Sequence, residues 1–242
     1  MNRIPLSLER PFLRDAIVEF RFRSLISASL LPGLLYERLR TMGWQAPSVA
    51  SSQAVQLGFD VLASASPIPQ LRNGDVRLQL MEDRVAFNIA GHYPGWSSYY
   101  RPLIHQTLEH LVDPDTVQLT QLGLRFINEL PHPDVFALVA RFDPGPIPKG
   151  LRTQRRAIAW DLTDDDRTAI KISLASDVRL TSGEIGSLLD VDLRWSFPEG
   201  GSDQYAVRKR LERLHDRNKQ IVFGHVLPEN FVADYGPTYL EN

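Results

Sequence analysis

The chain has 242 residues, of which 43% are hydrophobic and 23% charged, and its 27 basic and 29 acidic residues leave a net charge of −2. A balance this close to neutral argues against a dedicated nucleic-acid binder, because such domains usually carry an excess of Lys and Arg. The absence of cysteine excludes disulfides, thiolate zinc sites, iron–sulfur clusters and cysteine nucleophiles. No apolar run reaches the ~18 residues of a membrane helix and no secretory signal is recognisable, so we expect a cytoplasmic protein without a membrane partner.

The first half of the sequence alternates between strand and helix patterns. Alternating apolar residues predict a strand at 15–22, and apolar residues at helical spacing predict a helix at 30–42. Small and polar residues predict a loop at 46–54. The following segments predict strands at 55–62, 76–81, 84–89 and 117–130, a hairpin between 81 and 84, a type II turn at Pro94-Gly95, and a helix at 97–112 capped by Ser97 or Ser98.

Proline and glycine interrupt the second half repeatedly. Its patterns predict strands at 136–142, 156–162, 168–175 and 188–197, a polar hairpin tip at 163–167, and a helix from Ser202-Asp203 to about 222. We therefore predict an α+β fold of two successive, mostly antiparallel sheet units with helices packed on the sheet. The units are residues 1–130 and 131–242, packed as one continuous domain.

Carboxylates on one predicted strand are the candidates for catalysis. Asp190 and Asp192 alternate along the strand, so both project from one face, and Glu129 is a conceivable third ligand. Such carboxylates hold Mg²⁺ in many hydrolases and nucleases. Pairing with Arg125 or Arg194 explains the same charges without a metal, and we expect no cofactor.

The last predicted helix carries several Arg and Lys residues. The candidates for binding are Arg208, Lys209, Arg213 and Arg217, together with Arg125 on the strand predicted at 117–130. They suit phosphate or an acidic partner. Interspersed acidic residues dilute the charge, so a solvated helix face is the favoured interpretation.

Aromatic residues gather at the turn Tyr93-Pro94-Gly95-Trp96, directly after His92. His92, Tyr93 and Trp96 suit a ligand pocket or an interface, where Tyr and Trp are enriched. The plainer interpretation is that the aromatic rings anchor a helix to a sheet and that His92 is structural. None of the six histidines has a metal-binding spacing.

Several segments together resemble an uncharacterised, sporadically distributed bacterial family of unassigned function. They are 11–22, with Pro-x-x-x-x-Ala-Ile-Val-Glu; the Tyr-Pro-Gly-Trp turn at 93–96; Gly-Leu-Arg-Phe-Ile-Asn at 123–128; Leu-Asp-Val-Asp at 189–192; Leu214-His215; and the region of Phe223 and Phe231. The resemblance implies a shared fold. Patchy gene distribution of this kind is similar to that of mobile defence or toxin–antitoxin cargo, which implies a protein partner encoded nearby. His92 departs from the family's pattern.

The leading hypothesis is therefore a non-enzymatic binding or interaction protein, accessory or antitoxin-like, in a bacterial defence or mobile locus. One alternative is a metal-dependent hydrolase or nuclease using Asp190, Asp192 and Glu129. Another is nucleic-acid binding through the last helix, which the overall charge does not favour. A homodimer is plausible as well, because open edges of antiparallel sheets must be paired or covered.

Overall fold

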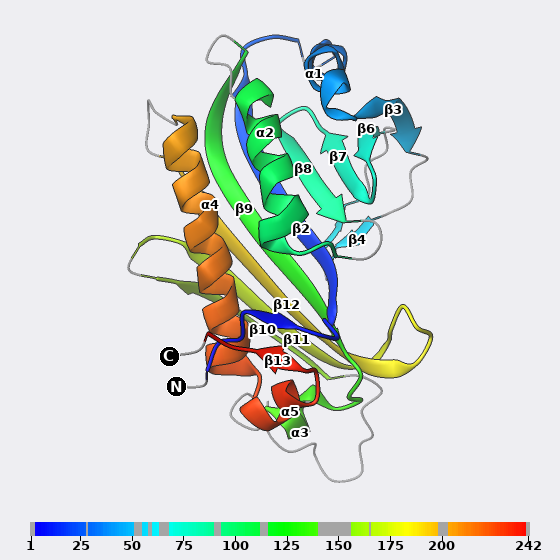
Figure 1. The fold of residues 1–242 in the computed structure, drawn as a ribbon, viewed down its shortest axis with the longest axis vertical. Helices are drawn as coiled ribbons and strands as arrows, with labels where there is room; N and C mark the ends of the chain where they lie inside the picture. Colours follow the sequence, from blue (N-terminus) through cyan, green and yellow to red (C-terminus); the bar gives the residue numbers. More distant parts are fainter. Residues whose placement is uncertain are drawn as a thin grey trace. The chain divides into compact units, whose positions relative to one another are not determined.

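The computed structural model describes residues 3–27, 29–50, 55–57, 60–62, 68–89, 93–111, 116–139, 156–164, 166–197 and 203–240 (Figure 1). Its antiparallel sheets and packed helices confirm the predicted α+β class. The chain divides into two compact units. Unit 1 comprises Met1–Arg14, Arg125–Leu193 and Glu212–Asn242, and unit 2 comprises Asp15–Leu124 and Arg194–Leu211. Both predicted halves, 1–130 and 131–242, thus contribute to both units.

The sheet of unit 2 has the strand order β9-β2-β8-β7-β6-β3. These strands are β2 (Leu13–Ser24), β3 (Gln45–Ala50), β6 (Ile68–Asn73), β7 (Val76–Leu80), β8 (Arg84–Ile89) and β9 (Val117–Leu130), and β4 (Val55–Leu57) pairs separately with β5 (Asp60–Leu62). The predicted hairpin between β7 and β8 is present, because Met81 N–H donates to the Arg84 carbonyl at 2.8 Å. On β2, Val18, Phe20 and Phe22 are buried on one face, which accounts for the period-two pattern, and Ile17 on the other face is buried as well.

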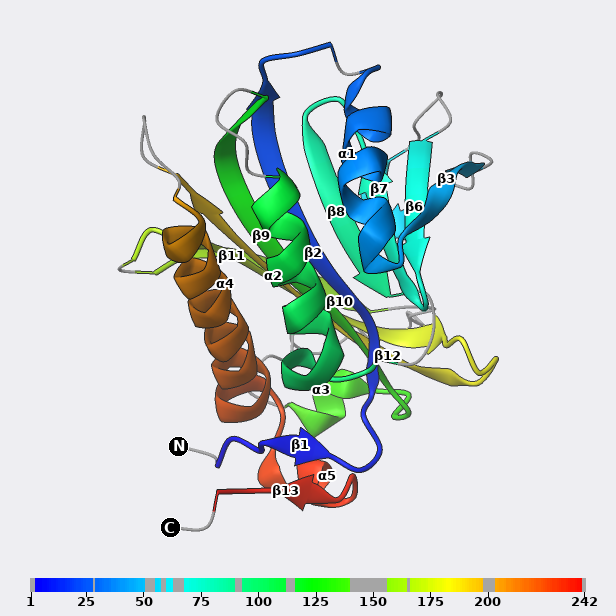
Figure 2. The same ribbon diagram turned by 45° about the horizontal axis from the view of Figure 1, so that its top comes forward.

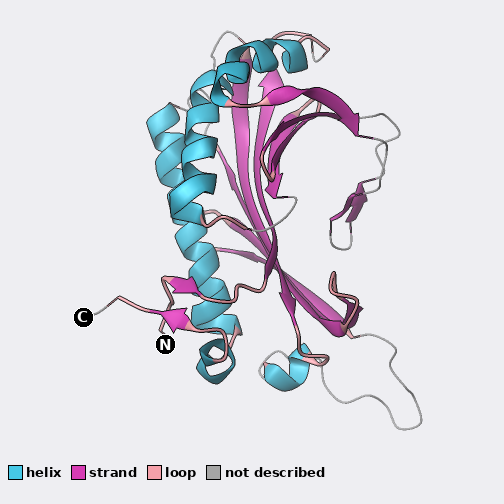
Figure 3. Ribbon diagram, turned by 45° about the vertical axis from the view of Figure 1, so that its right-hand side comes forward, coloured by secondary structure: helices cyan, strands magenta, loops and turns pink. Residues whose placement is uncertain are grey.

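Two helices cover one face of this sheet (Figures 2 and 3). Helix α1 (Leu31–Leu39) continues as a 3₁₀ turn, Arg40–Met42, and ends at Gly43, whose φ of 83° suits glycine. Helix α2 (Arg101–Leu111) is preceded by a π-helical turn, Trp96–Tyr100. Both predicted helices are therefore present, and within the described residues none is long and apolar enough to cross a membrane.

Unit 1 has the strand order β10-β11-β12-β9. The new strands are β10 (Ala157–Thr163), β11 (Ala169–Arg179) and β12 (Ile185–Ser196). The remaining elements are α3 (Val135–Leu138), α4 (Gln204–Lys219, the first half of which belongs to unit 2), a π-helical turn (Gln220–Val226), α5 (Glu229–Ala233), and the short pair β1 (Ser7–Leu8) and β13 (Pro237–Thr238), seen in Figure 2. Phe12 packs against the rings of Phe223, Phe231 and Tyr235, with centroid separations of 6.1, 6.2 and 5.2 Å, and this cluster holds the C-terminal elements to the start of the chain.

Two predicted features are wrong in detail, and one strand is missing from the prediction. Residues 46–50 belong to strand β3 and not to a loop, and β6 was not predicted. The strand expected at 136–142 is the short helix α3 as far as the structure describes it, because the Asp134 carboxylate accepts from Phe136 N–H and starts a helical turn.

The turn before α2 also differs from its prediction. Gly95 has φ 92° and ψ 142°, whereas the third residue of a type II turn has ψ near 0°. The expected serine cap is absent: Ser98 Oγ donates to the Pro94 carbonyl at 3.0 Å, and no side chain caps this helical segment. At the last helix the prediction is correct, since Asp203 accepts from Ala206 N–H at 2.8 Å.

Candidate functional site

The Asp190 carboxylate is paired with Arg125. Arg125 Nε donates to Oδ1 at 2.9 Å and Nη2 donates to Oδ2 at 2.6 Å, which is the two-pronged geometry of a strong ion pair. The two side chains are 17% and 14% exposed. Both carboxylate oxygens of Asp190, which a metal ion would need as ligands, therefore already accept hydrogen bonds from the charged Arg125 side chain on β9.

The other two candidate carboxylates do not join Asp190 in a metal site. Asp192 is 9% exposed on β12. Glu129 accepts from Thr181 N–H and from Thr181 Oγ1 at 2.7 Å, and it lies 3.4 Å from Arg14. Within the described residues no group of three His, Asp or Glu side chains could hold a metal ion. The geometry supports a structural role: Glu129 ties the tip of the β11–β12 hairpin to β9.

The cations of α4 separate into paired and exposed residues. Arg208 pairs with Glu109 and contacts the His105 carbonyl at 3.4 Å, which joins α4 to α2. Arg217 lies 3.7 Å from Asp164 at the β10–β11 hairpin. Lys209 and Arg213 are exposed. Two of the four predicted cations thus serve the fold, and two face solvent.

The aromatic cluster lies in the core of unit 2. Tyr100 is fully buried and its hydroxyl contacts the carbonyls of Ala16 and Phe87 at 3.0 and 3.2 Å. The Tyr93 and Trp96 rings lie 6.2 and 5.5 Å from it. Burial raises the pKa of both Tyr93 and Tyr100 well above the usual tyrosine value. These residues anchor the segment before α2 to β2 and β8, and His92 lies outside the described residues.

Strand β10 is a feature that the sequence analysis did not single out. It is the terminal strand of its sheet, and within the described residues no strand pairs with its outer side. Its pairing with β11 runs without interruption from Ala157↔Ala175 to Thr163↔Ala169. A regular ladder of seven residues with one unpaired side is a template for another strand.

The direction of each β10 backbone group follows from two hydrogen bonds. Ser176 N–H donates to the Arg156 carbonyl at 2.9 Å and Asp164 N–H donates to the Thr168 carbonyl at 3.1 Å. In an antiparallel pair, hydrogen-bonded residues alternate with residues whose N–H and C=O point away. Even-numbered residues therefore bond to β11. The residues whose N–H and C=O point outward are Ala157, Ala159, Asp161 and Thr163.

The even-numbered side chains of β10 form an apolar row. Ile158 and Trp160 are half-buried, and Leu162 is 48% exposed. They stand beside the buried β11 residues Leu174, Ile172 and Ile170, to which they are paired. A strand added to the edge would therefore extend an apolar face that already exists.

The terminal strand of unit 2 is different. In β3, Pro47 has no N–H to offer, and the register shifts between Gln45 and Ser48, which marks a bulge. Proline and bulges are the usual protection of an edge strand. β10 has no proline, no lysine and no bulge, and its only charge is Asp161.

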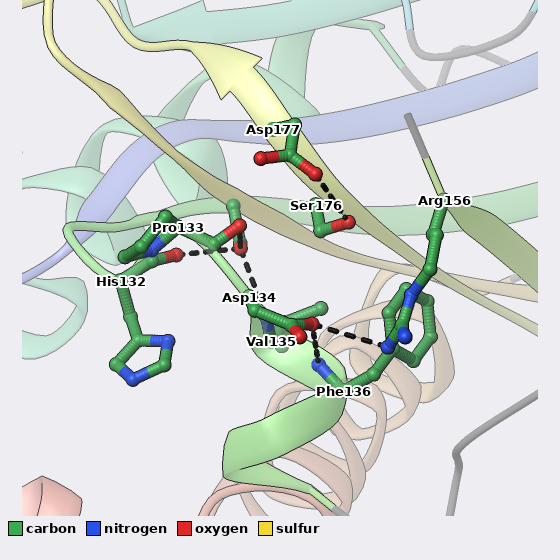
Figure 4. A network of polar contacts seen from close by, with 9 residues as sticks. His132, Pro133, Asp134, Val135, Phe136, Arg156, Ser176 and Asp177 are labelled. Carbon is green, nitrogen blue, oxygen red and sulfur yellow. Dashed lines mark hydrogen bonds and ion pairs between the residues drawn. The ribbon is translucent and has the colours of Figure 1, made fainter. Parts of the chain in front are cut away.

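A polar network holds the start of β10 in place (Figure 4). Arg156, directly before the strand, lies 3.2 Å from Asp134 Oδ1, and its guanidinium stacks 4.6 Å from the centroid of the Phe136 ring. Asp134 itself starts α3. The edge is therefore fixed by side chains of unit 1 before any partner binds.

The same network is closed by Ser187 on β12. Its Oγ lies 2.6 Å from the His132 carbonyl and accepts from Val135 N–H at 3.1 Å. Asp177 N–H donates to the Pro133 carbonyl at 3.0 Å, and Asp177 adopts a φ of 55°, which is uncommon for a residue other than glycine. These contacts fix the segment that leads from β9 into α3.

Comparisons with known proteins give little beyond this geometry. No family model and no curated protein matches the sequence. Among solved structures, the chain aligns with TBP from Methanococcus jannaschii at 12% identity, over 87% of this chain and 99% of that one, with a TM-score of 0.24. A TM-score this low supports no argument about fold or function.

Proposed function

We propose that this chain is a non-enzymatic interaction protein that binds a polypeptide by strand addition at the outer edge of β10. The observation that carries the proposal is the regular ladder of β10, whose outer side pairs with no strand in the part of the chain that the structure describes. Its outward backbone groups belong to Ala157, Ala159, Asp161 and Thr163. Strand addition uses such main-chain groups for affinity and the alternate side chains for specificity.

The chemistry of the edge describes the partner. An added strand forms main-chain hydrogen bonds worth about 0.5–1.5 kcal/mol each, net of water. Apolar side chains at alternate positions of the partner would continue the row of Ile158, Trp160 and Leu162. An acidic residue opposite Asp161 would be unfavourable, because like charges directly across a ladder repel.

The biological setting belongs to the same proposal. An accessory or antitoxin-like role in a bacterial defence or mobile locus, with a partner encoded nearby, is supported by the sequence resemblance and not by the geometry. A cytoplasmic location belongs to the same proposal and is supported by the sequence, in which no secretory signal is recognisable. Strand addition is a mode of binding that suits such a role, since it needs no catalytic group on this chain.

Ala159→Pro tests the proposal. The Ala159 N–H points outward, so proline removes a donor from the free edge while the ladder to β11 keeps its hydrogen bonds. Ala159→Ser is the matched control, because serine retains the N–H. Thermal melts of both variants verify that the fold is retained.

The readout is native mass spectrometry of each tagged protein purified from its native host, with the ratio of absorbance at 260 and 280 nm. We expect a bound polypeptide with the wild type and Ala159→Ser and its loss with Ala159→Pro. Equal binding by all three would refute the edge as the site. Nucleic acid without a polypeptide would instead favour the exposed Lys209 and Arg213 of α4.

A further inference from the structure

We infer that the polypeptide on this edge is β10 of a second copy of the chain, paired antiparallel about a two-fold axis at Trp160. The inference rests on the proposed strand addition, and at this edge it replaces the partner encoded nearby with a second copy of the chain. It follows from the sequence of β10, Ala157-Ile158-Ala159-Trp160-Asp161-Leu162-Thr163, and from the direction of its backbone groups.

The backbone limits the possible registers. Only odd-numbered residues point N–H and C=O outward, so odd residues of one copy must hydrogen-bond to odd residues of the other. A two-fold axis then passes through a residue of the strand, and only the axes at residues 159, 160 and 161 overlap most of β10. Registers that pair an odd residue of one copy with an even residue of the other are excluded, because the N–H and C=O groups of the even residues are already bonded to β11.

Charge and overlap select one of these three axes. An axis at Asp161 places it opposite the partner's Asp161, and like charges directly across a ladder repel. An axis at Ala159 leaves Thr163 opposite a residue before the strand begins. An axis at Trp160 overlaps all of β10 and places Asp161 opposite the partner's Ala159, which is small and uncharged.

The selected register is also the one that matches the apolar row. Trp160 faces the partner's Trp160 at the closer, non-hydrogen-bonded spacing of about 4.5 Å between Cα atoms, and Ile158 faces the partner's Leu162. Cross-strand aromatic and branched pairs each contribute about 0.2–1 kcal/mol. Four outward pairs, each exchanging two hydrogen bonds, give roughly eight bonds across the axis. Such a contact is self-complementary, as a two-fold dimer requires.

The first test is the oligomeric state of the purified chain. We expect sedimentation equilibrium to show a monomer–dimer equilibrium for the wild type and Ala159→Ser, and a monomer at the same concentrations for Ala159→Pro. Amide exchange by NMR should show protection of the Ala159 and Asp161 N–H groups that disappears on dilution. A wild type that is monomeric throughout, or a dimer that survives Ala159→Pro, would overturn the inference.

The second test measures the register by disulfide crosslinking. Because the sequence has no native cysteine, the introduced cysteines are the only thiols that can react. With the axis at Trp160, residue 159 lies opposite the partner's residue 161 at about 5.5 Å between Cα atoms, which a disulfide can bridge. Two copies of residue 159 lie diagonally at about 7–8 Å, beyond the usual range.

Ala159→Cys and Asp161→Cys proteins are therefore oxidised with a glutathione redox buffer, separately and as an equal mixture. We expect disulfide-linked dimers chiefly in the mixture, with Ser182→Cys at the exposed hairpin tip as the matched control that stays monomeric. Crosslinking of Ala159→Cys alone would place the axis at residue 159 and overturn the stated register.

The two proposals fail in distinguishable ways. If a different polypeptide copurifies from the native host and Ala159→Pro removes it, strand addition at β10 stands and the second-copy inference falls. If Ala159→Pro changes neither the bound polypeptides nor the oligomeric state, both fall.

Discussion

Breaking the Arg125–Asp190 pair should destabilise the protein substantially. Asp190→Asn keeps the shape of the side chain and removes the charge that accepts two hydrogen bonds at 2.9 and 2.6 Å. Breaking a fully buried pair costs about 3–5 kcal/mol, whereas an exposed pair contributes about 0–1 kcal/mol. Because these side chains are 17% and 14% exposed, we expect a loss of about 2 kcal/mol in the free energy of unfolding.

Urea unfolding of a four-member cycle measures this loss. The variants are Asp190→Asn, Arg125→Met and the two combined, compared with the wild type. We expect each single change to lower the midpoint with the slope unchanged, and the double variant to lose less than the sum of the two, because the second change removes a charge that the first left uncompensated.

Two results would refute this reasoning. A loss below about 0.5 kcal/mol for Asp190→Asn would show that water already screens the pair. A rise in melting temperature with Mg²⁺ for the wild type but not for Asp190→Asn would revive the metal-dependent hydrolase, since a ligand at 100 times its Kd stabilises the native state by about 2.7 kcal/mol. We expect Mg²⁺ to change neither protein.

Other predictions address single groups. Burial raises the pKa of Tyr100 above its usual value of 10.0, so the unfolded chain loses this proton first as the pH rises. The contribution of Tyr100 to the free energy of unfolding is therefore complete below pH 10 and falls above it by about 1.4 kcal/mol per pH unit. In urea unfolding from pH 8 to 11, the free energy of unfolding should fall less steeply with pH for Tyr100→Phe than for the wild type. An equal fall in the two proteins would contradict the raised pKa of Tyr100. Gly186→Ala should destabilise by about 1–3 kcal/mol, since the added Cβ would lie 2.5 Å from the Leu130 carbonyl oxygen and from Leu180 Cδ1. Gly33→Ala in α1 has open space around it and should stabilise by about 0.5–1 kcal/mol, with both changes read from denaturant midpoints and a reversed order counting against the packing argument.

Local patterns were sufficient for much of the fold. The long alternation at 117–130 predicted β9 with the bounds that it has, and Gly43 marked the end of the first helical segment. The short apolar run after Asp134 was misjudged as a strand because a few residues fit either period. The Asp134 cap was a usable signal for the helix that is present.

Sequence separation limited the prediction of the site. Arg125 was named beside Asp190 as one possible pair, but 65 residues separate them, and no local rule selects it over Arg194. β10 was predicted as a strand, yet its place at the edge depends on which distant strands pair, β9 with β12 among them. Whether a strand lies at an edge depends on the pairing of the whole sheet, so it cannot be predicted from the propensity or the periodicity of that strand's own residues.

Pro47 in β3 has a consequence for how large an assembly can become. In the proposed dimer, the outward N–H and C=O groups of each β10 are hydrogen-bonded to the β10 of the other copy. A third copy therefore finds no free β10 edge. Among the described strands, the other end of the nine-stranded sheet is β3, which has a proline and a bulge in place of a regular ladder. Association through the two terminal strands of this sheet is thus self-limiting at two copies, whereas a chain with a regular ladder at both ends could continue into a fibre.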